Sequence, residues 1–205
     1  MKTKVIITDL GNVVLYFDHM ITARALGGLL ELNGDYVYDV IEESGIVDDY
    51  VIGKTSDGDF YDQVIALLVG KHTVGFEEFA EIWGNIFIPN GEMIHTLREI
   101  KDRVTLVLLS NTNNLHFAYI EKHFLEVREL FGDRLILSHE VGLTKPDERI
   151  YQLALEAAGP DYGYSDCLYI DDIEKYVLAA QNLGMAGHVY SNHKQFEQYL
   201  QQLIK

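Results

Sequence analysis

The apolar residues of this chain follow two patterns: short segments of continuous hydrophobicity, and stripes in which they recur every three or four positions. Segments rich in β-branched, leucine or aromatic residues predict buried strands; they lie at 5–7, 104–109, 135–137, 167–170 and 187–190. Stripes typical of amphipathic helices lie at 94–100, 113–124, 150–157, 173–183 and 196–203. Strands that alternate with helices indicate a parallel sheet with helices on both faces.

The segment 16–89 differs from the rest because its apolar residues recur only at helical spacing. Phe60, Val64 and Leu67 form one such stripe, and Ser56 lies where it can cap that helix. The turn 89–91 marks the return to the alternating pattern. We therefore expect an α/β fold, with a Rossmann-like parallel sheet at 1–15 and 90–205 and an inserted α-helical cap subdomain at 16–89.

Composition narrows the function classes without choosing among them. The 205 residues suffice for one sizeable core and a modest insertion, and the net charge of −16 disfavours partnership with nucleic acid or an anionic membrane. No apolar run approaches the roughly 20 residues of a membrane span, and the first residues lack the pattern of a signal peptide. A single cysteine, Cys167, excludes an internal disulfide, so we expect a cytoplasmic protein. Its oligomeric state is not readable from the sequence.

Polar residues follow several of the predicted strands and are the candidates for chemistry. They are Asp9, Ser110, Asn111, Lys145, Asp171 and Asp172. The carboxyl ends of parallel strands meet at one edge of a sheet, where such folds bind ligands, so these side chains can converge. Each has a plainer interpretation, as a turn residue, a helix cap or a surface lysine. The adjacent acidic pair makes better sense with a divalent cation between it and Asp9.

Taken in order, these residues resemble the four motifs of the haloacid dehalogenase superfamily. The motifs read DLGNV at 9–13, LSN at 109–111, GLTKP at 142–146 and DD at 171–172. The third is particularly similar to the phosphatase members, and the helical insertion resembles the first type of cap in that superfamily. DLGNVV and LSNTN resemble the bacterial sugar-phosphatase group that includes α-D-glucose-1-phosphate phosphatase.

The resemblance implies a Mg²⁺-dependent phosphohydrolase that acts on a small phosphorylated metabolite. Asp9 would be the nucleophile and would form an aspartyl-phosphate. Ser110 and the backbone N–H of Asn111 would hold phosphate oxygens, and Lys145 would neutralise charge on the phosphoryl group. The Mg²⁺ ligands would be the carboxylates of Asp9, Asp172 and Asp171 and the carbonyl of Gly11. The metal and the lysine would supply the positive charge that an acidic protein needs at a phosphate site.

Two positions depart from the motifs of the phosphatases. Gly11 stands where most of them have a second Asp that acts as general acid/base, a contribution typically worth about 10²–10⁴-fold. Anomeric sugar phosphates, whose leaving groups are more acidic than ordinary alcohols, should suffer least from this loss; Asp18 or a cap residue is a possible replacement. Tyr176 stands where the fourth motif usually has Asn or Asp, and either weakens metal positioning or simply packs against the cap.

Two other functions stay open at this point. A 2-haloacid dehalogenase also uses an Asp nucleophile and a Lys, but it needs no metal and would leave the acidic pair unexplained. A non-catalytic binding or regulatory protein on the same scaffold is suggested by Gly11 and Tyr176. The retained Asp9, Ser110 and Lys145 favour the phosphohydrolase.

Overall fold

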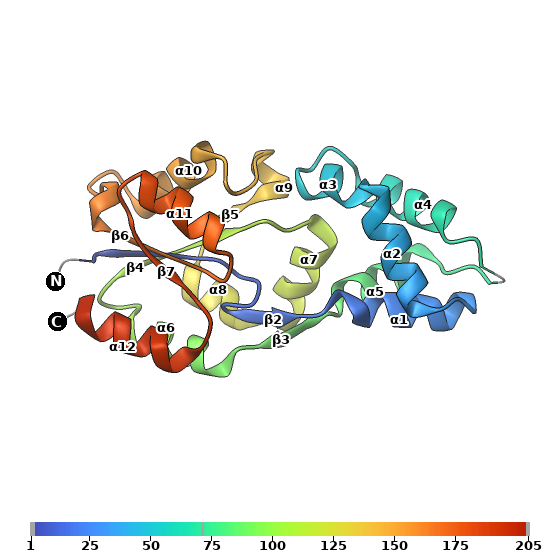
Figure 1. The fold of residues 1–205 in the computed structure, drawn as a ribbon, viewed down its shortest axis with the longest axis horizontal. Coiled ribbons are helices and arrows are strands. Elements are labelled where there is room, and N and C mark those ends of the chain that lie inside the picture. The colour runs from blue at the N-terminus through green and yellow to red at the C-terminus, as the bar shows by residue number, and fades with distance from the viewer. Residues whose placement is uncertain (1–2, 71, 204–205) are drawn as a thin grey trace.

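The computed structural model describes residues 3–70 and 72–203, and its centre is the expected parallel sheet (Figure 1). Five strands lie in the order β5-β4-β1-β6-β7, and every neighbouring pair is parallel. The strands are β1 (Val5–Thr8), β4 (Thr105–Ser110), β5 (Leu135–Leu137), β6 (Cys167–Asp171) and β7 (Ala186–Val189). The predicted α/β Rossmann-like core is therefore confirmed.

Helices cover both faces of this sheet because successive strand residues point to opposite sides. Val5 and Ile7 pack with α10 (Glu148–Ala158) and α11 (Glu174–Asn182), whereas Ile6 packs on the other face. The helices on that second face are α6 (Gly91–Ile100), α7 (Asn114–His123), α8 (Leu125–Phe131) and α12 (His193–Leu203). The central strands β1, β4 and β6 are buried on both faces, which explains their nearly continuous hydrophobicity.

The helical insertion lies beyond one end of the sheet and has its own hydrophobic core (Figure 1). Its helices are α1 (His19–Leu30), α2 (Gly34–Ser44), α3 (Ile46–Val51), α4 (Asp57–Leu67) and α5 (Phe76–Gly84). Phe60, Phe79 and Trp83 are buried together in this core, and Val64 of the predicted stripe is also completely buried. Ser56 caps α4 by accepting a hydrogen bond from Asp59 N (3.2 Å).

A two-stranded antiparallel ribbon connects the insertion to the core, and the sequence did not predict it. It pairs β2 (Leu15–Phe17), where the chain leaves the core for the insertion, with β3 (Phe87–Pro89), where it returns. Strands this short carry no readable alternation. The boundaries that the sequence predicts for the cap subdomain, at 16 and 89, fall inside this ribbon. The division into core and cap stays a prediction.

Other differences from the predicted elements are small. The helix expected at Pro146 begins two residues later as α10, with Asp147 as its N-cap, and a short α9 (Ser138–Val141) follows β5. Cys167 is buried in β6, where burial raises its pKa to about 12, as expected of a packing residue. Within the described ranges, no helix is long and apolar enough to cross a membrane.

Candidate functional site

The carboxyl ends of the three central strands bring most of the predicted residues to one edge of the sheet. Asp9 follows β1 directly, Ser110 is the last residue of β4, and Asp171 is the last residue of β6. The register aligns these ends, since Thr8 pairs with both Leu108 and Ile170. The parallel topology thus produces the convergence that the sequence suggested.

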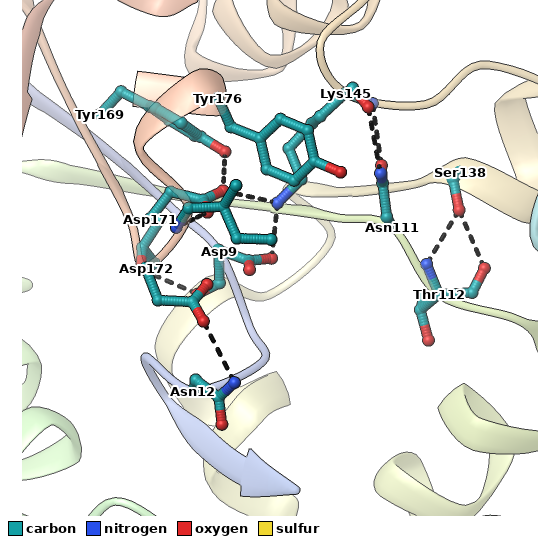
Figure 2. A network of polar contacts seen from close by, with 12 residues as sticks. Asp9, Asn12, Asn111, Thr112, Ser138, Lys145, Tyr169, Asp171, Asp172 and Tyr176 are labelled. Atoms are coloured by element: carbon teal, nitrogen blue, oxygen red, sulfur yellow. Dashed lines mark hydrogen bonds and ion pairs between the residues drawn. The ribbon is translucent and has the colours of Figure 1, made fainter. Parts of the chain in front are cut away.

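Lys145 lies at the centre of this edge and is not a surface lysine. Its side chain is 1% exposed, and its Nζ lies 2.8 Å from Asp9 Oδ1 and 2.7 Å from Asp171 Oδ2 (Figure 2). Burial opposes its charge, but the two carboxylates outweigh that effect and raise the pKa of Lys145. The ammonium group therefore stays charged and holds one oxygen of Asp9 in place.

Asp171 is completely buried, and both of its carboxylate oxygens are already bonded. Oδ2 accepts hydrogen bonds from Lys145 Nζ and from the hydroxyl of Tyr169, and Oδ1 accepts one from Ile173 N (2.8 Å). The bond to Ile173 partly fits the helix-cap interpretation, although α11 has no side-chain cap at its N-cap residue. Tyr169 was missed by sequence reasoning because a tyrosine in an apolar strand resembles any other core aromatic.

Asp172 lies at the rim of the same cluster. Its Oδ2 accepts a hydrogen bond from Asn12 Nδ2 (3.1 Å), and burial raises its pKa. Asn12 was also missed; it has φ +54°, a left-handed conformation that asparagine tolerates better than most residues. Burial similarly raises the pKa of Asp9 to about 7, against the opposing effect of the Lys145 ammonium.

The acidic cluster fits a hard divalent cation. Carboxylate oxygens of Asp9, Asp171 and Asp172 all lie within 4.8 Å of one another, and oxygen is the ligand type that Mg²⁺ prefers. Because Asp171 already accepts three hydrogen bonds, Asp9 and Asp172 have the freer oxygens. Among the described residues no group donates a hydrogen bond to the carbonyl of Gly11, which is therefore also available.

The motif after β4 does more than cap a helix. The cap of α7 is Asn113, whose Oδ1 accepts a hydrogen bond from His116 N (3.0 Å), so the capping role considered for Ser110 and Asn111 was wrong. Asn111 instead binds the backbone of Lys145: its Oδ1 accepts from Lys145 N (2.9 Å) and its Nδ2 donates to Lys145 O (3.3 Å). The side chain of Ser110 has no hydrogen bond to any described residue and faces the same cavity as Asp9.

The structure supplies a physical reason for Gly11. A Cβ atom at this position would lie 2.6 Å from Cε1 of Phe17, so the phenylalanine ring fills the space that a side chain would need. Of the residues that follow the turn, Phe17 lines the cavity, Tyr16 is exposed, and Asp18 caps α1 by accepting a hydrogen bond from Met20 N (2.9 Å). Asp18 does not line the cavity.

Tyr176 lies beside the lysine and packs against the hydrophobic core of the sheet. The Nζ of Lys145 is 5.1 Å from the centre of the Tyr176 ring, within the range of a cation–π contact (Figure 2). The ring also lines the cavity that contains Asp9. Tyr176 thus contacts the charged centre directly, where a polar residue of the fourth motif was expected.

A cavity of about 190 Å³ opens over this cluster, between the sheet edge and the insertion. Its walls include two histidines that sequence reasoning missed, His19 of α1 and His116 of α7. Their rings stack with centroids 5.9 Å apart. His116 is buried, and burial lowers its pKa to about 3. Nothing in their sequence spacing relates one histidine to the other; the fold alone brings their rings together.

A sheet edge with a buried Asp–Lys–Asp centre and a metal-compatible acidic cluster defines a candidate hydrolase site. The chain belongs to the haloacid dehalogenase-like hydrolases, whose family model matches residues 3–184. The predicted superfamily is therefore confirmed.

Several solved structures share this fold. A haloacid dehalogenase family enzyme from Bacteroides thetaiotaomicron, in complex with magnesium and inorganic phosphate, is 21% identical with a TM-score of 0.80; the match covers 92% of this chain and 94% of that one. A predicted hydrolase of the family from Porphyromonas gingivalis is 18% identical, with a TM-score of 0.79 and coverage of 100% and 99%. An L-2-haloacid dehalogenase from Xanthobacter autotrophicus is 15% identical, with a TM-score of 0.64 and coverage of 99% and 84%. At these identities the similarity shows the fold alone.

Proposed function

We propose that this protein is a Mg²⁺-dependent phosphohydrolase that acts on a small phosphorylated metabolite. The observation that carries the proposal is the carboxylate of Asp9, buried at the floor of a cavity, with Oδ1 held 2.8 Å from Lys145 Nζ and two further aspartates beside it. Phosphoryl transfer needs mainly positioning and charge stabilisation, and this arrangement provides both. The magnesium and phosphate bound by the Bacteroides enzyme agree with this choice of reaction.

In this proposal Asp9 is the nucleophile. Lys145 holds Oδ1, which leaves Oδ2 as the oxygen that attacks phosphorus. The new Oδ2–P bond forms as the bond from phosphorus to the ester oxygen breaks, and the departing oxygen takes a proton from solvent or a nearby acid. Water then attacks the aspartyl-phosphate, which releases phosphate and restores Asp9.

The remaining residues would hold the phosphoryl group. Ser110 Oγ, the N–H of Asn111 and the ammonium of Lys145 would contact its oxygens, and the Asn111 side chain keeps Lys145 in position. A Mg²⁺ ion bound by Asp9, Asp172 and the Gly11 carbonyl, with Asp171 beside it, would neutralise phosphate charge when present. That charge matters because the protein as a whole is strongly acidic.

A sugar phosphate, such as an anomeric 1-phosphate, is the substrate we favour. Gly11 cannot donate a proton to the leaving group, so esters with acidic leaving groups should react fastest. The helical insertion would act as a cap of the first type that closes over the substrate and excludes water. This part of the proposal fails if rates across a series of phosphate esters are independent of leaving-group acidity.

The decisive experiment measures phosphate release from a panel of sugar phosphates with and without Mg²⁺, for the parent and for Asp9→Asn. Asp18→Asn is the matched control: it makes the same chemical change at a residue outside the cavity and keeps a good helix cap. We expect Mg²⁺-dependent turnover in the parent and the control, with a loss of at least about 10³-fold in Asp9→Asn.

Other outcomes would redirect the assignment. Turnover retained in Asp9→Asn would remove the proposed nucleophile. Chloride release from 2-haloacids without metal would favour the dehalogenase, and failure to bind either Mg²⁺ or phosphate would favour a non-catalytic role. Equal losses in Asp9→Asn and Asp18→Asn would show that Asp18 takes part in the reaction.

A further inference from the structure

The carboxylate of Asp171 is held from three directions. It belongs to the last residue of β6, is completely buried, and does not line the cavity over Asp9. Lys145 and Tyr169 both donate to its Oδ2 (Figure 2), and the backbone N–H of Ile173 donates to its Oδ1. A carboxylate oxygen accepts about two hydrogen bonds, so Oδ2 has no acceptor site left for another partner. Asp171 is thus bound to the lysine and to the protein interior.

Tyr169 helps to fix this carboxylate, although it does not line the cavity. Residues two apart in a strand point to the same face, so Tyr169 and Asp171 lie side by side on β6 and the phenol hydroxyl reaches Oδ2. The Tyr169 ring is completely buried and meets the ring of Tyr151 edge to face, with centroids 5.3 Å apart. Phenylalanine would fill the same space without a donor. Packing alone therefore gives no reason for the hydroxyl.

Asp172 differs from Asp171 although the two are adjacent in the sequence. Its side chain is partly exposed and lines the cavity, and its Oδ2 accepts a hydrogen bond from Asn12 Nδ2 (3.1 Å). Its carboxylate keeps acceptor sites for a cation in the cavity. The acidic pair is thus divided: Asp172 is available to a metal, and Asp171 is the partner of Lys145.

We infer that Tyr169 is a positioning residue, whose hydroxyl keeps Asp171 as the partner of Lys145 and off the metal. A hydrogen bond to a charged group is stronger than one between neutral groups, so the hydroxyl satisfies much of the demand of Asp171 for donors. Asp171 then neither binds Mg²⁺ nor pulls the ammonium away from Asp9 and the phosphoryl oxygens. The inference rests on the proposed phosphohydrolase function, and it assigns a role to a residue that contacts neither substrate nor metal.

Removal of the hydroxyl should move two affinities in opposite directions. In Tyr169→Phe, Asp171 loses a donor and compensates by binding Mg²⁺ or by drawing Lys145 toward itself. We expect Mg²⁺ to bind about three- to tenfold more tightly, and inorganic phosphate at saturating Mg²⁺ to bind about three- to tenfold more weakly. Titration calorimetry measures both affinities without turnover. Tyr190→Phe is the matched control, because it removes another buried hydroxyl, which accepts from Asn90 Nδ2 (2.9 Å) and does not line the cavity.

A double-mutant cycle tests whether Tyr169 acts through Asp171. In an Asp171→Asn background the carboxylate is gone, so adding Tyr169→Phe should change either affinity by less than about twofold. The single variants also separate the two aspartates. We expect Asp172→Asn to weaken Mg²⁺ binding at least about tenfold more than Asp171→Asn does, because Asp172 is a ligand in this inference and Asp171 is not.

Each outcome bears on either the inference or the function beneath it. If both affinities fall together in Tyr169→Phe, or neither changes, or Tyr190→Phe has the same effect, Tyr169 is a core residue and the inference is overturned. Equal losses of Mg²⁺ binding in Asp171→Asn and Asp172→Asn would make Asp171 a ligand, so the inference fails and the function stands. If the parent binds neither Mg²⁺ nor phosphate, the function itself fails.

Discussion

The contact between Gly11 and Phe17 limits the size of the side chain that position 11, two residues after Asp9, can hold. Gly11→Asp alone must displace the Phe17 ring, since its Cβ would lie 2.6 Å from Cε1, and overpacking of this kind typically costs about 1–3 kcal/mol. Phe17→Ala makes room. We expect Gly11→Asp alone to lower turnover. On alkyl phosphates, the double variant Gly11→Asp with Phe17→Ala should turn over faster than Phe17→Ala alone, by up to about 10²-fold.

The comparison that isolates proton donation uses two substrates and one further variant. Alkyl phosphates have poor leaving groups and should gain from an added acid, whereas aryl phosphates should gain little. Gly11→Ala with Phe17→Ala controls for the change of shape at position 11. An equal gain on both substrates would attribute the effect to packing and not to a proton donor.

His116 makes the stability of the fold depend on pH. Its pKa is about 3 in the folded protein against 6.5 for an ordinary histidine, so between these values the unfolded chain binds a proton that the folded chain does not. The free energy of unfolding should therefore fall as the pH drops below 6.5, at about 1.4 kcal/mol per pH unit from this residue. His116→Gln should flatten this dependence in urea unfolding between roughly pH 6 and 4. His95→Gln, on the exposed side of α6, controls for the loss of an imidazole. If the free energy of unfolding has the same slope against pH in the parent and in His116→Gln, the prediction is contradicted.

At the residue scale, the sequence predicted the parts of the site that strand ends position. Asp9, Ser110 and Asp171 converge because parallel strands deliver their ends to one edge, and Lys145 joins them from the loop before α10, where Asn111 binds its backbone. Tyr169, Asn12 and the two histidines of the cavity were not predicted. Tyr169 looks like a core residue, and the approach of His19 to His116 depends on α5, which packs against the helices of both histidines. Such contacts are properties of the packed fold and not of a local pattern.

At the scale of elements, the loop after α3 holds the insertion against the core. Ser138 Oγ lies 2.7 Å from the carbonyl oxygen of Val51, and Gly53 approaches α9 so closely that a Cβ would lie 2.0 Å from the carbonyl oxygen of His139. Gly53 also has φ +70°, where a side chain is strained. Glycine is thus required here for two separate reasons, and the loop sets how the insertion covers the cavity.

We expect Gly53→Ala to lower the free energy of unfolding by at least about 1–2 kcal/mol, the cost of the left-handed conformation alone. Gly28→Ala is the matched control, because its new Cβ inside α1 meets nothing within 4 Å and should stabilise by about 0.5–1 kcal/mol. Urea unfolding followed by the fluorescence of Trp83, the one tryptophan of the chain, reports on the insertion directly. Similar effects of the two substitutions would show that the loop is free to move away from α9.

The fold itself was largely predictable because its central strands are buried on both faces and its helices are amphipathic. The hydrophobic patterns of such strands and helices can be recognised without knowing how the side chains pack. The β2–β3 ribbon was not predictable, since each strand has only three residues and their pairing joins positions separated by the whole insertion. The ribbon nevertheless contributes to the site, because Phe17, the last residue of β2, lines the cavity over Asp9.

At the scale of the whole molecule, a net charge of −16 opposes the approach of the anionic substrate that we propose. Salt screens this repulsion, since the Debye length shortens from about 30 Å at 0.01 M to about 8 Å at 0.15 M ionic strength. We therefore expect kcat/KM for a sugar phosphate to rise severalfold over this range at saturating Mg²⁺, while kcat stays constant because the buried ion pairs around Lys145 are screened far less. Steady-state rates in KCl and in NaCl would separate screening from the effect of a particular ion. A kcat/KM that falls with salt would mean that the local field of Lys145 and the bound metal extends beyond the cavity and dominates the acidic surface.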